Sequence, residues 1–426
     1  MRSPSTRVLV LGGGAAGLAA AARLSRRVAV VLIEARERLG GRVDTRIDPA
    51  LGVAVERGAE FVHGRPERTL ALARRAHARL REVPDRHLRL VKGRLSDATR
   101  TFSAAQELLG LDGRDEEPFA TVLRRARRER RFPPAAIDMA GEFVRGFYLA
   151  DPSRASSLAL ADMTRALDQV GGDVAYRVDG GYARVLAPLR RQLERSGVDV
   201  RLSTVVDEIR WRRGTVDVRA AGAAGGRLPS LKGDRLIVTV PVPALGRLRF
   251  APALAAHRRA ATALTMGPLV KVLLRFRRAP WGSRRLAFLH VPGAPVPVLW
   301  TTAPAPSPVL VGWAGGPDGL RLAGKPRTTI LRAAIASAAR GLRRRPADLE
   351  AQLDSAIVAD WTSDPFALGG YAVFPVGSAE ARRALARSVE GTLFFAGEAT
   401  AGGEAGTVEG ALRSGERAAG EVIASL

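Results

Sequence analysis

Three glycines near the start of the chain and one glutamate behind them have the types and spacing of a nucleotide-binding turn. Gly12, Gly14 and Gly17 follow the apolar run at residues 8–11, and Glu34 comes 22 positions after Gly12, where about 20 are expected. Gly12 permits a tight turn, Gly14 lets a diphosphate approach the backbone, and Gly17 lets a helix pack closely on a strand. Glu34 would accept hydrogen bonds from a ribose. This set predicts a dinucleotide site.

Two strands and a helix are needed to position these residues. Residues 8–11 and 28–33 have the pattern of buried strands. Residues 18–24 are typical of an Ala-rich helix, and its N-terminus, with Ala16 in the preceding turn, would present free N–H groups to phosphates. The glycine pattern can also arise by chance, and the uncharged run at 8–22 resembles a secretory signal. Three glycines weaken a signal helix, whereas the strand–turn–helix interpretation requires them.

The segment that follows Glu34 resembles the one that distinguishes FAD-binding amine oxidases from nicotinamide dehydrogenases. The resemblance implies that FAD is the cofactor and that Ala35, Arg36, Gly41 and Arg42 help to bind it. Arg42 follows a Gly-Gly turn and can offer a bidentate guanidinium fork to a diphosphate. An isolated arginine in a chain so rich in arginine would usually be solvated, but its register with the glycine turn favours a cofactor residue.

Composition limits the chemistry of the site and the class of protein. The chain of 426 residues has a mean hydropathy near zero, which predicts a soluble globular protein of two domains. It has no cysteine, so disulfides and a cysteinyl-flavin bond are excluded, and the FAD is expected to be non-covalent. The five histidines have no ligand spacing, so no metal is predicted. No apolar run reaches the roughly 18 residues of a membrane span, and the cytoplasm is the expected location.

The net charge of +25 is the feature of the composition that suggests an anionic partner. Such a field attracts anions and repels cations. The densest arginine run, at residues 124–131, would point all round a helix and has no interleaved aromatic residues on which bases could stack. A solvated helix is therefore favoured over a nucleic-acid surface, and an acidic partner remains an alternative.

The two ends of the chain are expected to build one domain. A strand at 393–396, a turn and an amphipathic helix at 408–426 mirror the N-terminal pattern. We predict a Rossmann-type α/β FAD-binding domain with an inserted α+β substrate-binding domain. Residues 65–178 have mostly helical patterns, such as 68–80 and 135–147. The predicted FAD-binding domain comprises residues 1–64, 180–245 and 360–426, and the substrate-binding domain comprises 65–179 and 246–359.

Motifs along nearly the whole chain resemble flavin-containing monoamine and polyamine oxidases, most of all bacterial members. Residues 58–64 resemble the segment that passes the flavin ring, residues 205–209 the strand that contacts adenine, and residues 266–272 the strand with the active-site lysine. Residues 360–361, 369–371, 395–400 and 406–411 resemble the C-terminal signature. The resemblance implies cofactor contacts from Gly58, Ala59, Glu60, Val206, Trp361, Gly397, Glu398, Thr407 and Val408, and catalytic roles for Lys271, Tyr371 and His63.

The chemistry of amine oxidation indicates what Tyr371, Glu398 and the residues at 407–408 would do. A hydride moves from the carbon beside nitrogen to flavin N5, which leaves negative charge near N1 and the C2 carbonyl. A helix beginning at Thr407 and Val408 would stabilise that charge. Glu398 would bind ribityl or ribose hydroxyls. Tyr371 would form an aromatic wall that orients a neutral amine, with an ordinary strand aromatic as the alternative.

Lys271 lies in an apolar strand and shares a face with Leu273 and Arg275. A solvated face is one interpretation. The other is functional, because this is one of only four lysines in the chain, and in the family this lysine holds a water near N5 that is linked to reoxidation by oxygen. His63 would lie near the substrate or be a satisfied polar residue at the cavity edge.

Two departures from the family pattern restrict the predicted function. Gly370 stands where enzymes with covalent flavin have cysteine, and Thr407 stands where monoamine oxidases place a second tyrosine. We predict an FAD-dependent oxidase of the C–N bond of a small primary or secondary amine, with O2 as acceptor and with an imine and H2O2 as products. The alternatives are an L-amino-acid oxidase with an arginine in the cavity, a carotenoid-type desaturase, and a non-catalytic FAD protein. The oligomeric state is not predicted.

Overall fold

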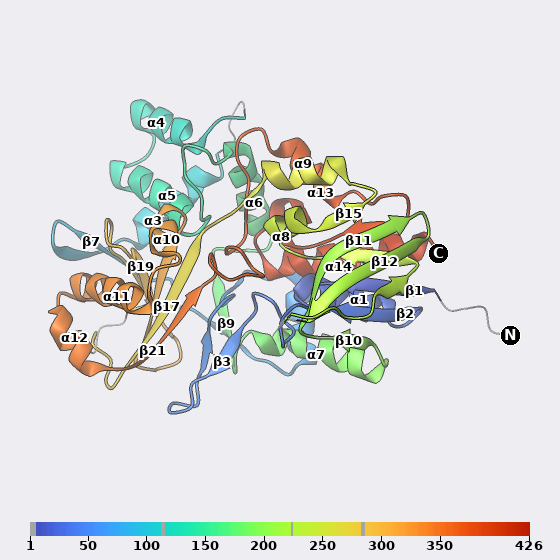
Figure 1. The fold of residues 1–426 in the computed structure, drawn as a ribbon. Coiled ribbons are helices and arrows are strands. Elements are labelled where there is room, and N and C mark those ends of the chain that lie inside the picture. Colours follow the sequence, from blue (N-terminus) through green and yellow to red (C-terminus); the bar gives the residue numbers. More distant parts are fainter. Residues whose placement is uncertain (1–5, 112–115, 223–224, 283–285) are drawn as a thin grey trace.

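A parallel five-stranded sheet forms one half of the molecule in the computed structural model, which describes residues 6–111, 116–222, 225–282 and 286–426 (Figure 1). Its strand order is β10-β2-β1-β14-β23, and every neighbouring pair is parallel. The strands are β1 (Arg7–Leu11), β2 (Ala29–Ile33), β10 (Asp199–Arg201), β14 (Arg235–Val238) and β23 (Leu393–Phe395). The sheet therefore joins segments from both ends and the middle of the chain, as expected for a Rossmann-type domain.

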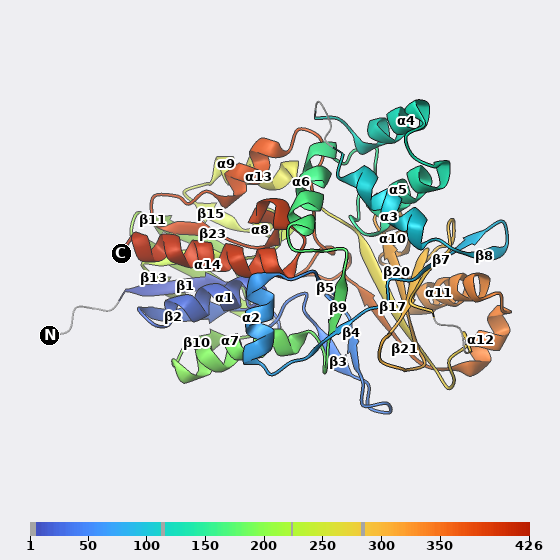
Figure 2. The same cartoon turned by 180° about the vertical axis from the view of Figure 1, so that it is seen from behind.

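Both faces of this sheet are covered, which explains its continuous apolar strands. One face packs against helices α1 (Ala15–Leu24), α7 (Ala183–Arg195) and α14 (Val408–Ala424) (Figure 2). The other face packs against a four-stranded sheet and three helices, of which α8 follows β14 directly. These elements are β11 (Thr204–Arg212), β12 (Thr215–Gly222), β13 (Leu231–Gly233), β15 (Arg249–Ala251), α8 (Val242–Arg247), α9 (Ala255–Ala263) and α13 (Ala379–Ala386).

A mixed seven-stranded sheet forms the other half, in the order β21-β17-β20-β19-β18-β7-β8. One face packs on helices α10 (Pro317–Leu322), α11 (Arg327–Leu342) and α12 (Pro346–Gln352). The opposite face carries an aromatic cluster that includes Phe288 and Trp300. The strands are β7 (His87–Val91), β8 (Arg94–Asp97), β17 (Leu269–Phe276), β18 (Phe288–His290), β19 (Val298–Thr301), β20 (Val309–Gly315) and β21 (Leu353–Asp360).

Residues 65–178 contain more strand than the sequence predicts. The predicted helix 68–80 is α2 (Glu67–Arg75), and it ends early because His77 adopts a positive φ of 49° and strand β6 begins at Leu80. The predicted helix 135–147 is confirmed as α5. The remaining helices here are α3 (Thr99–Leu109), α4 (Phe119–Glu129), α5 (Pro134–Gly146) and α6 (Ser157–Asp168), and the strands additional to β7 and β8 are β6 (Leu80–Glu82) and β9 (Ala175–Val178).

The arginine-rich run lies on and after α4, where Arg124, Arg127 and Arg128 are exposed. Phe119, Val122 and Ala126 form the buried face of this helix. Short strand pairs complete the fold: β3 (Thr45–Ile47) with β4 (Ala54–Glu56), β5 (Val62–His63) with β9, and β16 (Thr265–Met266) with β22 (Ala372–Val373). Within the described ranges, no helix combines the length and apolar character that crossing a bilayer requires.

Candidate active site

One cavity of about 800 Å³ lies between the two halves, at the carboxyl ends of the parallel strands. Ligands of open α/β sheets bind at this edge. All of the site residues predicted from the sequence line this cavity except two, Gly17 and Lys271. The lining residues among them are Gly12, Gly14, Ala16, Glu34, Ala35, Arg36, Gly41, Arg42, Gly58, Ala59, Glu60, His63, Val206, Trp361, Tyr371, Gly397, Glu398, Thr407 and Val408.

The glycine turn has the backbone geometry that its sequence requires. Gly12 has a φ of 107°, and a Cβ at Gly17 would lie 1.8 Å from the Gly12 carbonyl oxygen, so the helix approaches the turn as closely as backbone allows. Gly14 is the N-cap of α1 and has no side chain to cap the free amides. A Cβ at Gly14 would meet no atom within 4 Å and would project into open space. The turn therefore leaves a cradle beside a helix N-terminus, which suits a diphosphate.

Glu34 lies buried at the end of β2 and faces the cavity. Its carboxylate accepts hydrogen bonds from the backbone N–H of Gly13 at 2.6 Å and of Arg36 at 2.9 Å. A carboxylate has about four acceptor positions, so two remain for hydroxyl groups of a ligand. The Arg36 guanidinium forms an ion pair with Asp364. This arrangement fits the ribose contact expected of Glu34.

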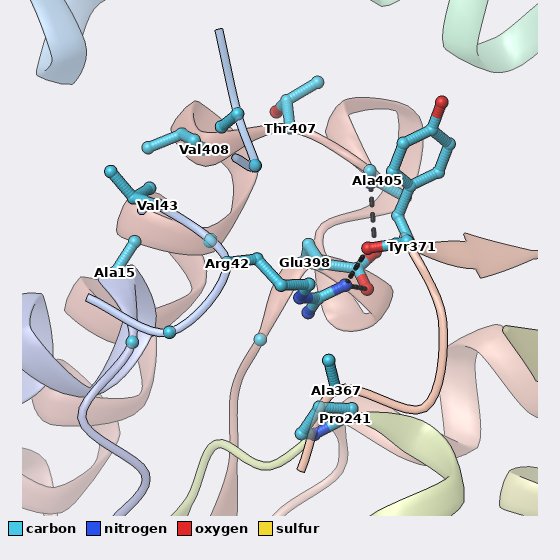
Figure 3. Close-up of a pocket in the computed structure, with 18 of the residues that line it drawn as sticks. Ala15, Arg42, Val43, Pro241, Ala367, Tyr371, Glu398, Ala405, Thr407 and Val408 are labelled. Carbon is cyan, nitrogen blue, oxygen red and sulfur yellow. Dashed lines mark hydrogen bonds and ion pairs between the residues drawn. The ribbon is translucent and has the colours of Figure 1, made fainter. Parts of the chain in front are cut away.

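Arg42 and Glu398 point toward one another from opposite sides of the cavity (Figure 3). The Arg42 Nη1 atom donates to Glu398 Oε1 at 3.0 Å and to the Gly370 carbonyl at 2.6 Å. The remaining N–H groups, on Nε and Nη2, have no partner within the described part of the chain. Glu398 also accepts from the Gly406 N–H at 3.1 Å. The pair links the N-terminal and C-terminal motifs and leaves part of the guanidinium for an anion.

The N-terminus of α14 reaches the cavity wall, which Thr407 and Val408 line (Figure 3). The Thr407 hydroxyl caps the helix by accepting from the Gly410 N–H at 2.9 Å. The cap fixes the start of the helix at the predicted residue and directs the positive end of its dipole to the cavity.

Lys271 lies behind the cavity wall and is fully buried, so the interpretation as a solvated face is wrong. Its Nζ atom donates to Glu60 Oε2 at 2.6 Å and to the Gly58 carbonyl at 3.1 Å. Glu60 also forms an ion pair with Arg177 and accepts from Trp300 Nε1 at 3.0 Å. Burial by itself raises the pKa of Glu60, but Arg177 and Lys271 together lower it to about 2. The carboxylate is thus held charged in the protein interior.

Tyr371 and His63 lie on the cavity wall, as predicted. The Tyr371 hydroxyl donates to the Phe147 carbonyl, and burial raises the pKa of this phenol, so it stays neutral. His63 is open to the cavity, and its partial enclosure lowers the pKa of the imidazole. Both side chains are therefore uncharged at neutral pH.

Sequence reasoning missed most of the aromatic lining. Phe147, Trp300 and Trp313 line the cavity without having been predicted, whereas Phe61 belongs to the 58–64 segment that was expected there. Trp300 and Trp313 lie in strands β19 and β20, where an apolar residue is usually core, so the local pattern carried no signal. Arg177 was missed for a similar reason, because only the folded chain brings it to Glu60.

Comparisons with known proteins agree with this geometry. A family model described as flavin containing amine oxidoreductase matches residues 15–423. The chain is 27% identical to lysine-specific histone demethylase 1B of Mus musculus, over 98% of this chain and 53% of that protein. It is 28% identical to polyamine oxidase 3 of Oryza sativa subsp. japonica, over 99% and 90% respectively. The chain spans about half the length of the histone demethylases that it matches.

Two solved structures have the same fold. Wild-type putrescine oxidase bound to putrescine superposes with a TM-score of 0.80 at 22% identity, over 98% of this chain and 99% of that chain. Cyclohexylamine oxidase from Brevibacterium oxydans IH-35A gives a TM-score of 0.80 at 23% identity, over 98% and 99%. These likenesses confirm the predicted mixed α/β fold class.

Proposed function

Because the chain belongs to the family of flavin-containing amine oxidoreductases, we propose that it binds FAD non-covalently and oxidises the C–N bond of a primary or secondary amine. The family match confirms the resemblance drawn from the sequence, and it makes the protein a flavin-dependent oxidoreductase that acts on amines. The observation that carries the finer proposal is the convergence of the glycine cradle, Glu34, Arg42 and the α14 N-terminus on one cavity.

The residues present fit FAD at three places. The Gly14 cradle and the α1 amides suit the diphosphate, and the unpaired N–H groups of Arg42 suit the same anion. The free acceptor positions of Glu34 suit the adenosine ribose. Glu398, buried and held by Arg42, can accept from the remaining sugar hydroxyls. The absence of cysteine supports a cofactor that is held by these contacts alone.

The flavin would supply hydride acceptance from the carbon next to the amine nitrogen, followed by return of the electrons to O2, which gives an imine and H2O2. The N-terminus of α14 supplies backbone N–H groups and a positive dipole for developing negative charge. Lys271 has three N–H groups and uses two on Glu60 and Gly58. The third has no hydrogen-bond partner in the described part of the chain, where Nζ also lies 5.6 Å from the Trp300 ring centroid, and it can hold a water.

Tyr371 and His63 are proposed to orient the amine. Their neutral state suits a substrate that must react as the neutral amine, because hydride loss needs the nitrogen lone pair. The Tyr371 hydroxyl is fixed on the Phe147 carbonyl, so the ring is held in one position on the wall. We keep the division into two domains, the cytoplasmic location and O2 as acceptor as parts of the same proposal.

The cavity favours an amine over an α-amino acid. An amino acid oxidase needs a cation to bind the substrate carboxylate. In the described structure the arginines that line the cavity are Arg36, Arg42 and Arg247. Arg36 is paired with Asp364 and Arg42 with Glu398, and Arg247 lies on α8 after β14, on the nucleotide-binding side. The aromatic wall thus offers no carboxylate clamp.

An anaerobic substrate screen tests the proposal. The purified protein should be yellow, and a panel of amines, amino acids and alcohols should be mixed with it without oxygen. We expect at least one amine to bleach the flavin absorption near ~450 nm, and admission of oxygen to restore it with formation of H2O2. Bleaching by amino acids alone would overturn the assignment. Colourless protein that takes up no FAD would overturn the cofactor as well.

A further inference from the structure

The chain has few aromatic residues, and more than half of them line this one cavity. The chain contains 22 aromatic residues in all, and twelve of them line this cavity. Phe61, Trp300 and Trp313 come from the seven-stranded sheet side, and Phe147 and Tyr371 face them from other segments. Phe61 and Trp300 are 5.6 Å apart between ring centroids, as are Trp300 and Trp313. Phe61, Trp300 and Trp313 therefore form a continuous run of rings, and together with Phe147 and Tyr371 they make up the aromatic wall of the substrate half of the cavity.

The polar atoms of this wall are bonded within the protein. Trp300 Nε1 donates to Glu60, Trp313 Nε1 donates to the Gly146 carbonyl at 2.7 Å, and the Tyr371 hydroxyl donates to the Phe147 carbonyl. Rings with satisfied polar atoms present only their faces and edges to a ligand. The wall therefore selects for apolar surface and offers few hydrogen bonds.

The buried carboxylates at the cavity are also engaged. Glu60 is paired with Lys271 and Arg177, and Glu398 is paired with Arg42. Glu409 accepts from the backbone N–H groups of Arg68 and Thr69 and from the Thr69 hydroxyl. Glu34 belongs to the nucleotide side. Glu404, which is half-buried and also lines the cavity, is paired with Arg413. Within the described ranges, no buried carboxylate beside the aromatic wall is left to neutralise a second ammonium group.

We propose that the substrate is a monoamine with an apolar body, arylalkyl in preference to alkyl, and that diamines and polyamines are excluded. The inference rests on the proposed amine oxidation and narrows its substrate class. One amino group reacts and need not be charged. Each further ammonium would lose its hydration without gaining a counter-ion, which costs more than a cation–π contact returns. The rings of Phe61 and Trp300 already have the cations of Arg177 and Lys271 over them. An aromatic body instead gains offset-stacked and edge-to-face contacts from the rings.

Asp85 and Asp173 are the carboxylates that would bind the second amino group if the substrate were a diamine. Both line the cavity but are exposed, and Asp85 already contacts His87 Nε2 at 3.1 Å. Exposed carboxylates at the rim attract a cation without burying it, so they do not supply the counter-ion that a second ammonium needs inside the cavity. Preference for a diamine would show that these rim residues form a subsite, and would overturn the proposal.

Steady-state kinetics on matched amines give the first test. Butylamine and 1,4-diaminobutane differ only in the second amino group, and 2-phenylethylamine adds the ring. We expect kcat/KM to be highest for 2-phenylethylamine and at least 100-fold lower for the diamine than for butylamine. A kcat/KM for the diamine equal to or above that for butylamine overturns the inference.

Binding without turnover separates this inference from the proposed function. Butyltrimethylammonium and 1,4-bis(trimethylammonio)butane have no nitrogen lone pair, so neither is oxidised, and calorimetric titration of the FAD-bound protein measures their affinities directly. We expect the single cation to bind at least tenfold more tightly. If it does and no amine bleaches the flavin, the oxidase assignment fails while the cavity inference stands. Tighter binding of the dication overturns the inference whatever the enzyme oxidises.

A substitution on the wall provides the residue-level test. Trp313→Leu removes a ring face, and we expect kcat/KM for 2-phenylethylamine to fall about tenfold while that for butylamine changes less than threefold. Trp211→Leu is the matched control, because Trp211 lies on β11 and does not line the cavity. Equal losses for both amines in Trp313→Leu would show a general structural effect and count against selection by the ring. The calorimetric titration uses the wild-type protein, so it tests the inference even if Trp313→Leu does not fold.

Discussion

Replacing Lys271 by Met tests the buried ion pair and its proposed role together, because Met keeps a similar length and apolar stem but removes the ammonium. Glu60 keeps Arg177 and the Trp300 N–H after the change, so its carboxylate is not stranded. Moving a carboxyl pKa from 4.5 to about 2 corresponds to roughly 3 kcal/mol of preference for the charged form. Lys271 supplies part of that preference, so the free energy of unfolding should fall by about 1–3 kcal/mol.

The same variant should separate oxygen chemistry from cofactor binding. Lys271 does not line the cavity, so FAD should stay bound. We expect reoxidation of the dithionite-reduced variant to slow by about 10- to 1,000-fold in stopped-flow, which is roughly 1.4–4 kcal/mol of barrier. Lys325→Met, at an exposed lysine, is the control and should change stability by less than about 0.5 kcal/mol. A wild-type reoxidation rate in Lys271→Met would refute its catalytic role, and unchanged stability would refute the ion pair.

Three further predictions address the cofactor and the pH dependence of stability. Gly14 has an ordinary φ of −76°, and a Cβ added there would meet open space, so the melting temperature of Gly14→Val should stay within a few degrees of the wild type. The variant should nevertheless purify without FAD. Stoichiometric FAD in this variant would show that the phosphate cradle is misplaced. Acid precipitation should release all of the FAD into the supernatant, and colour in the pellet would contradict non-covalent binding. Burial raises the pKa of Glu56 to about 7, so the stability that Glu56 contributes should be full below pH 4.5 and fall by roughly 3 kcal/mol as pH rises through 7. Denaturant unfolding between pH 4.5 and 8 should show this slope flattened in Glu56→Gln, and an unchanged slope would contradict the assignment.

The cofactor half of the cavity was predictable because its requirements are local. A turn that brings Gly17 onto the Gly12 carbonyl admits no side chain, so the backbone geometry is visible as glycine in the sequence. Glu34 was predictable because its spacing from Gly12 matches the length of one strand–helix–strand unit. The start of α14 at Thr407 is marked by a capping residue for the same reason.

The substrate half was less predictable because its contacts are distant in sequence. Lys271 and Glu60 are 211 residues apart, and strand alternation placed Lys271 on a face without saying what covers that face. The same limitation hid Trp300 and Trp313, which have the appearance of core residues. The early end of α2 depends on a left-handed residue that is not glycine, His77, and such a residue leaves no clear signal.

The discontinuous parallel sheet has a consequence for how the protein can be made. Strand β1 lies between β2 and β14, and the sheet ends with β23 while α14 covers the face beside α1. At roughly 5–20 residues per second, a ribosome would need about 20–80 s to move from the first residue of β1 to the first residue of β23. Until then the apolar surface beneath α14 has no cover, and Glu398 and the α14 N-terminus do not exist. The nascent chain can therefore complete its cofactor site only after β23 and α14 have left the ribosome, and until then the unfinished sheet is exposed to chaperones.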